Sequence, residues 1–129
     1  MNSKEKAVQA VLVGQSSPER SRALYDEHVA DECVWENTGF PTVSGRAEVN
    51  ALLDTLYANG YYSLDQHILN IATVGGVVLA ERYEKMLRED GSVICEFKIV
   101  GVFELNGNDK ITAWRDYFDF TIAQKAFAG

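Results

Sequence analysis

The pattern of apolar and polar positions divides this chain into a helical first half and a β-rich second half. Helices are predicted over residues 4–13, 18–28 and about 45–59, with a short strand at residues 33–37 between the last two. Ser17 and Pro18 give the second helix a capping hydroxyl and a proline suited to its first turn. Gly14 ends the first helix.

The second half has the alternation expected of strands. Long strands are predicted over residues 63–74, 77–87, 93–105 and 110–119, and a short helix over residues 121–127 closes the chain. Helices followed by a mostly antiparallel meander indicate an α+β domain, and 129 residues fit a single domain over residues 1–129. Strands this long must twist and curl, so helices on one face would complete a cone with an internal pocket.

Charged residues interrupt two of the apolar strands. Arg82 and Glu84 are two apart and therefore point the same way, while Trp114, Asp116 and Phe118 share a face of the last strand. A carboxylate flanked by aromatic rings is costly to bury unless it is paired or functional. If Arg82 lies between Glu84 and Asp116, one carboxyl can stay protonated while the other is ionised, as acid–base catalysis requires. The competing interpretation is a solvated set of cross-strand ion pairs.

Composition and charge exclude several classes of partner. The net charge of −7 comes without a basic stripe, which argues against nucleic acid and against anionic membrane surfaces. We find no signal peptide and no apolar run of about 20 residues, so a cytoplasmic protein is expected. The chain also lacks a nucleophile elbow, a phosphate-binding loop, a dinucleotide fingerprint and a zinc motif.

Four isolated residues are given structural roles. Cys33 and Cys95 are expected to be small apolar residues in buried strands. His28 is expected to close a helix, where a cation complements the helix dipole. His67 shares a predicted strand face with apolar neighbours, so a core position is favoured over one lining the pocket.

Several motifs together resemble the limonene-1,2-epoxide hydrolase family. The similarity runs from about residue 34 to the C-terminus and rests on Trp35-Glu36-Asn37, Gly45-Arg46, Glu81-Arg82-Tyr83-Glu84, Gly101-Val102-Phe103-Glu104-Leu105 and, most specifically, Trp114-Arg115-Asp116-Tyr117-Phe118-Asp119. The resemblance implies the cone fold of nuclear transport factor 2 and ketosteroid isomerase. It also implies a homodimer, a small hydrophobic substrate and no cofactor. An outer sheet face carrying Tyr83, Arg115, Tyr117 and Asp119 suits a dimer formed across the sheet.

The resemblance also assigns catalytic roles. Asp116 corresponds to the family's water-activating aspartate, Arg82 to its bridging arginine and Asn37 to its water-holding asparagine. Two positions depart, since Glu84 stands where the family has a proton-donating aspartate and Trp35 where it has a water-holding tyrosine. An indole N–H donates a hydrogen bond but accepts none, so Trp35 cannot hold water as a phenol does.

The activity implied is hydrolysis of a terpene-like epoxide without a metal or a covalent intermediate. The residues Trp35, Trp114, Phe118 and Met86 would form the apolar wall of the pocket, although Met86 also suits the core. Two alternatives stay open. The same carboxylates could serve an isomerase or cyclase acting on a polyketide, a polyether epoxide or a steroid-like substrate, or the domain could bind a small molecule without catalysis.

Overall fold

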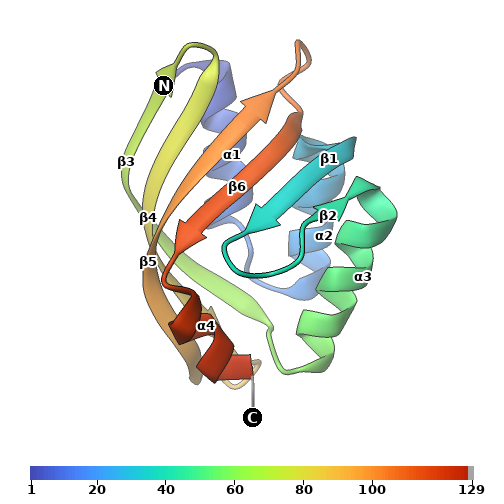
Figure 1. Ribbon diagram of the computed structural model, residues 1–129, viewed down its shortest axis with the longest axis vertical. Helices are drawn as coiled ribbons and strands as arrows, with labels where there is room; N and C mark the ends of the chain where they lie inside the picture. Colours follow the sequence, from blue (N-terminus) through green and yellow to red (C-terminus); the bar gives the residue numbers. More distant parts are fainter. Residues whose placement is uncertain (128–129) are drawn as a thin grey trace.

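The computed structural model describes residues 1–127 and follows the predicted order of helices and strands (Figure 1). The elements are α1 Ser3–Val13, α2 Pro18–His28, β1 Val29–Asn37, β2 Val43–Ser44, α3 Gly45–Ala58, β3 Ser63–Val74, β4 Val77–Leu87, β5 Val93–Leu105, β6 Ile111–Phe118 and α4 Phe120–Phe127. Asn2 caps α1 through a capping box with Glu5, and Ser17 caps α2.

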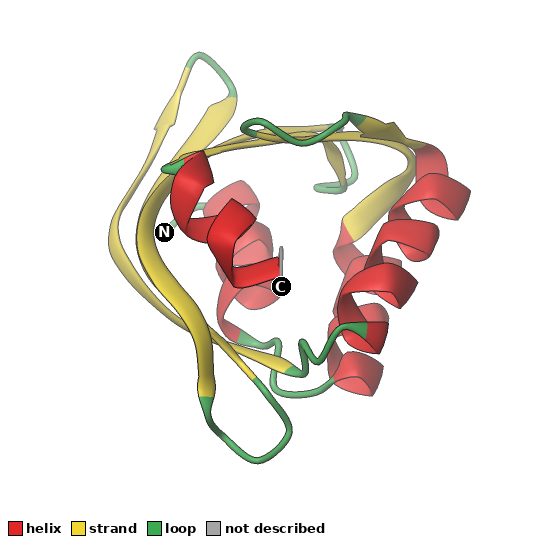
Figure 2. Cartoon of the chain, turned by 60° about the horizontal axis from the view of Figure 1, so that its bottom comes forward, coloured by secondary structure: helices red, strands yellow, loops and turns green. Residues whose placement is uncertain are grey.

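The strands form one curved sheet in the order β2-β1-β6-β5-β4-β3. β1 and β6 run parallel, and all the other neighbours are antiparallel. Figure 2 shows the sheet wrapping around the helices, which lie on its concave side, with α4 at one end. This arrangement confirms the predicted α+β fold. No helix in residues 1–127 is long and apolar enough to cross a membrane.

The inner row of β4 shows how the sequence places the site. Residues of β4 alternate between buried and half-buried along its whole length, so Ala80, Arg82, Glu84 and Met86 all face inward. Ala80 belongs to a core cluster under α1 and α2, whereas Met86 belongs to a second cluster nearer α4. The two charged residues of β4 therefore lie where the two clusters meet.

The structure differs from the sequence-based expectation at β1 and β2. β1 begins at Val29 and not at Cys33, because a register shift between Val29 and Val34 interrupts its alternation. The two-residue strand β2 lies directly before the predicted third helix, where no strand was predicted. Both cysteines are buried and free, as expected, and burial raises the pKa of each thiol to about 11.

The core position predicted for His67 is wrong. Its side chain is 68% exposed and lies near Asp65 on the outer side of the sheet. Register shifts between Ile68 and Asn70, and the inward row of β3 passes from Ile68 to Ile71. Ile71 therefore faces inward, whereas His67 and Leu69 are exposed, and His67 does not share the core face with its apolar neighbours. His28 does end α2, as predicted.

Candidate active site

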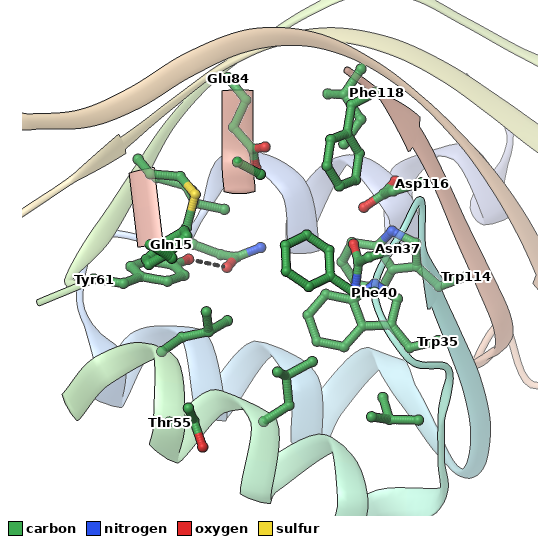
Figure 3. A pocket seen from close by; sticks show the side chains of 18 of the residues that line it. Gln15, Trp35, Asn37, Phe40, Thr55, Tyr61, Glu84, Trp114, Asp116 and Phe118 are labelled. Carbon is green, nitrogen blue, oxygen red and sulfur yellow. Dashed lines mark hydrogen bonds between the residues drawn. The ribbon is translucent and has the colours of Figure 1, made fainter. Parts of the chain in front are cut away.

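A cavity of about 640 Å³ opens inside the cone. It is lined by all eight residues predicted for the site, namely Trp35, Asn37, Arg82, Glu84, Met86, Trp114, Asp116 and Phe118. Figure 3 shows Glu84 and Asp116 projecting from different strands into the same space, with the aromatic rings between and below them. The size of the cavity suits a small organic ligand, and most of the cavity wall is apolar.

Arg82 and Asp116 form a buried ion pair across the sheet. Nη1 of Arg82 donates to Oδ1 of Asp116 at 3.0 Å, and the two side chains are 1% and 5% exposed. Their strands are not neighbours, because β5 runs between them. Removing either partner would leave a buried charge without compensation.

Gly101 on β5 makes this pair possible. It lies opposite Asp116 in the sheet. A Cβ atom at Gly101 would come within 2.4 Å of Arg82 Nη1 and 2.8 Å of Asp116 Oδ1. A glycine in a strand interior often marks such a close approach.

Gln66 on β3 is the second partner of Arg82. Its Oε1 accepts from Nε of Arg82 at 3.1 Å, and its Nε2 donates to the Leu12 carbonyl oxygen at 2.7 Å. Gln66 is 8% exposed and lines the cavity. The guanidinium is thus shared between one carboxylate and one neutral amide.

The expectation that Arg82 bridges both carboxyls is wrong for Glu84. Within residues 1–127, no Arg82 nitrogen lies within 4.0 Å of a Glu84 oxygen, and the Glu84 carboxyl makes no hydrogen bond. Glu84 is nevertheless 7% exposed. Burial raises its pKa from the ordinary 4.5 to about 7, the Arg82 charge opposes that rise, and Asp116 adds to it. A substantial fraction of Glu84 is therefore protonated at neutral pH.

Asn37 is held beside Asp116 by the parallel pairing of β1 and β6. The two residues are register partners. The next residue, Thr38, ties the end of β1 to β6, because both its backbone N–H and its Oγ1 donate to the Asp116 carbonyl oxygen. Figure 3 shows the Asn37 amide in the cavity on the same side as Asp116.

Two tryptophans pack below Asp116. Trp35 and Trp114 are also register partners, and their ring centroids are 5.4 Å apart. Both indole N–H groups are buried without an acceptor among residues 1–127. Trp35 therefore contributes apolar wall, and it offers none of the hydrogen-bond acceptance that a phenol would provide.

Three residues of the site were missed by the sequence-based prediction, although signals for them existed. Gln66 occupies the same inward row as Leu64 and Ile68, so strand alternation places it inside. Gly101 is a glycine within an otherwise regular strand. Tyr25 lies on the buried face of α2 and lines the cavity.

Tyr25 brings a phenol to this cavity from the helical layer. Its ring lies 6.1 Å from that of Trp35 and 5.9 Å from that of Trp114. Burial raises the pKa of Tyr25 well above 10, and the charges of Asp116 and Glu84 raise it further. The hydroxyl therefore stays neutral and can both donate and accept a hydrogen bond.

Known proteins are similar to this chain in sequence and in fold. Residues 3–128 match the family model of the limonene-1,2-epoxide hydrolase catalytic domain. Epoxide hydrolase EphG of Mycobacterium tuberculosis (strain ATCC 25618 / H37Rv) is 34% identical over 94 residues. That alignment covers 73% of this chain but only 60% of EphG.

Solved structures are also similar to this chain. An LEH-like epoxide hydrolase of M. tuberculosis superposes with a TM-score of 0.75 at 28% identity, covering 97% of this chain and 89% of that one. An NTF2-like protein of Burkholderia pseudomallei K96243 superposes with a TM-score of 0.77 at 15% identity over the full length of both chains, which shows a shared fold. Together with the family match over residues 3–128, these likenesses establish that the chain belongs to the limonene-1,2-epoxide hydrolase family.

Proposed function

We propose that this protein opens a hydrophobic, terpene-like epoxide by adding water in one acid–base step, giving a vicinal diol. The observation that carries the proposal is the different environment of the two carboxyls in one cavity. Asp116 is ion-paired with Arg82, whereas Glu84 is buried, has no ion pair among residues 1–127 and has a pKa of about 7. Such a pair can supply a base and an acid at the same pH.

In the proposed step, a water hydrogen-bonded by Asn37 gives a proton to Asp116 as its oxygen attacks an epoxide carbon. The carbon–oxygen bond of the ring breaks, and Glu84 gives its proton to the departing oxygen. Asp116 then carries the extra proton and Glu84 the negative charge, so a proton must return through solvent before the next turnover. A positioned acid and a positioned base each contribute about 100- to 10,000-fold in rate.

The apolar wall supports a hydrophobic substrate. The rings of Trp35 and Trp114 and the side chains of Met86 and Phe118 line the cavity with the carboxyls. Phe118 also stacks on Phe97, with ring centroids 5.2 Å apart. Excluding water from the wall strengthens the electrostatic action of the carboxyls on a bound epoxide.

Trp35 favours a second candidate, a cyclase or isomerase of the same scaffold. The family places a water-holding tyrosine at this position, and an indole cannot accept a hydrogen bond from water. A hydroxyl group of the substrate would then replace water as the nucleophile, with Asp116 as its base. The product would be a cyclic ether.

The two candidates are separated by oxygen-18 labelling. A panel of terpene and aryl epoxides, some carrying a free hydroxyl, is incubated with the protein in H₂¹⁸O and the products are analysed by mass spectrometry. One ¹⁸O atom in a diol supports the hydrolase. An unlabelled cyclic ether supports the cyclase, and no conversion of any substrate contradicts both.

A further inference from the structure

We propose that Gln66 is a positioning residue that holds the Arg82 guanidinium on Asp116 and away from Glu84. The inference deepens the function proposed above, because it explains how the acid Glu84 and the base Asp116 are kept in different protonation states. Only the catalytic role of Gln66 rests on that proposed function. The hydrogen bonds of Gln66, Arg82 and Asp116 do not depend on which function is correct.

The Gln66 amide has only one orientation that satisfies its neighbours. The Leu12 carbonyl can only accept a hydrogen bond, so it must face the NH₂ group of Gln66, at 2.7 Å. Nε–H of Arg82 can only donate, so it must face the oxygen, at 3.1 Å. Leu12 belongs to the last turn of α1, where carbonyls have no partner within the helix.

In this orientation the hydrogen bonds of Gln66 go to Leu12 and Arg82 and not to Glu84. The two residues lie directly opposite each other on β3 and β4, and both face the cavity. The amide nevertheless reaches diagonally to Arg82, whose own register partner is Ile68. Each end of the Gln66 amide thus makes one hydrogen bond, and neither of them goes to Glu84, its nearest cross-strand neighbour.

The neutrality of Gln66 matters as much as its geometry. Nε is bonded to the amide and Nη1 to Asp116, and among residues 1–127 no Arg82 nitrogen lies within 4.0 Å of a Glu84 oxygen. An opposite charge within about 4–6 Å lowers the pKa of a carboxyl by about 1–3 units. A freed Arg82 that moved onto Glu84 would ionise it and remove the proton donor. Gln66 restrains Arg82 without adding a second negative charge beside Glu84.

The test measures the ionisation of Glu84 directly, without substrate. Protein labelled with ¹³C at the glutamate carboxyls is titrated by NMR, and the Glu84 signal is identified by its loss in Glu84→Gln. In Gln66→Met, we expect the Glu84 midpoint to fall by about 1–3 pH units as Arg82 turns to it. An unchanged midpoint in the folded variant would overturn the proposal.

Gln15→Met is the matched control. Gln15 is another buried glutamine lining the cavity, and its Nε2 donates to the Val11 carbonyl of the same helix end at 3.1 Å. It makes no hydrogen bond to Arg82 in the described chain. Its replacement should lower stability in a similar way while leaving the Glu84 midpoint in place. An equal shift in both variants would show a general effect of packing and would overturn the proposal.

Gln66→Glu keeps the test open if Gln66→Met does not fold. When protonated, the new carboxyl offers the same donor and acceptor as the amide, so the variant should fold at acidic pH. When ionised, it adds a negative charge beside Glu84, and the Glu84 midpoint should rise above that of the wild type. A midpoint at or below the wild-type value would count against the proposal.

The same variants separate this proposal from the enzymatic one. If an epoxide is opened, the alkaline limb of the kcat profile should move with the Glu84 midpoint in Gln66→Met and stay in place in Gln15→Met. If no epoxide is opened but the midpoint still moves, the proposed function fails and the role of Gln66 stands. If turnover is found and the midpoint does not move, the reverse holds.

Discussion

Gly101 and Arg82 share one small volume of the protein interior, because the guanidinium passes over the glycine to reach Asp116. A Cβ atom at residue 101 would lie 2.4 Å from Arg82 Nη1, a distance that side chains do not tolerate. The ion pair between Arg82 and Asp116 therefore depends on the absence of a side chain at residue 101 of β5, the strand between the two partners.

Gly101→Ala should break the pair. Arg82 must move or the strand must shift, and overpacking of this kind costs about 1–3 kcal/mol of unfolding free energy. Epoxide turnover should fall together with the unfolding free energy. Urea unfolding and a kinetic assay check both effects. Gly107→Ala is the control, since a Cβ at this turn residue has no neighbour within 4 Å; equal behaviour of the two variants would show that the contact at residue 101 is unimportant.

Asp116→Asn should remove the base while keeping the shape of the side chain and an oxygen for Arg82. We expect turnover to fall by about 100- to 10,000-fold, as for loss of a positioned base. The circular dichroism spectrum should match that of the wild type. Asp65→Asn, on the outer side of the sheet near His67, should retain full turnover. Undiminished turnover in Asp116→Asn would assign the base to another group.

Glu84 should make the protein less stable as pH rises. Because its pKa is about 7 when folded and its ordinary value is 4.5, the folded state holds a proton that the unfolded state releases between these values. Its favourable contribution is complete below pH 4.5 and is lost as pH rises through 7. At 1.36 kcal/mol per unit, the loss amounts to about 3 kcal/mol.

The variant Glu84→Gln isolates this effect. It should match the wild type in unfolding free energy near pH 4.5 and exceed it at pH 8, while losing epoxide turnover at both. Urea unfolding at several pH values measures the difference, and Glu96→Gln, an exposed position on β5, provides the control. A difference that does not change with pH would show that Glu84 ionises normally in the folded protein.

We expect a homodimer formed across the outer face of the sheet. Val100 and Tyr117 are register partners there, and they are 42% and 53% exposed. Sedimentation should give twice the chain mass at micromolar concentration, and Tyr117→Lys should weaken the dimer. Val74→Lys, at an exposed residue beside the β3–β4 turn, should leave it intact. A wild-type protein sedimenting as a monomer would contradict the expectation.

Strand alternation was sufficient to predict that Arg82, Glu84 and Asp116 face one interior, because β4 and β6 are regular there. It was not sufficient to predict which residues Arg82 contacts. That choice depends on Gly101 and Gln66, which come from the two strands on either side of β4. The error at His67 has a related origin, since a register shift inside β3 cannot be read from alternation alone.

The hydrogen bond from Gln66 to Leu12 has a further consequence for how the protein tolerates change. It joins Asp116, Arg82 and Gln66 in one chain of contacts that ends at the backbone of α1. The first helix of the sequence is thereby part of the support of the reactive centre, although the motifs that mark the family begin some twenty residues later. We therefore expect substitutions that loosen the packing of α1 to change first the pKa values of the carboxyls in the cavity.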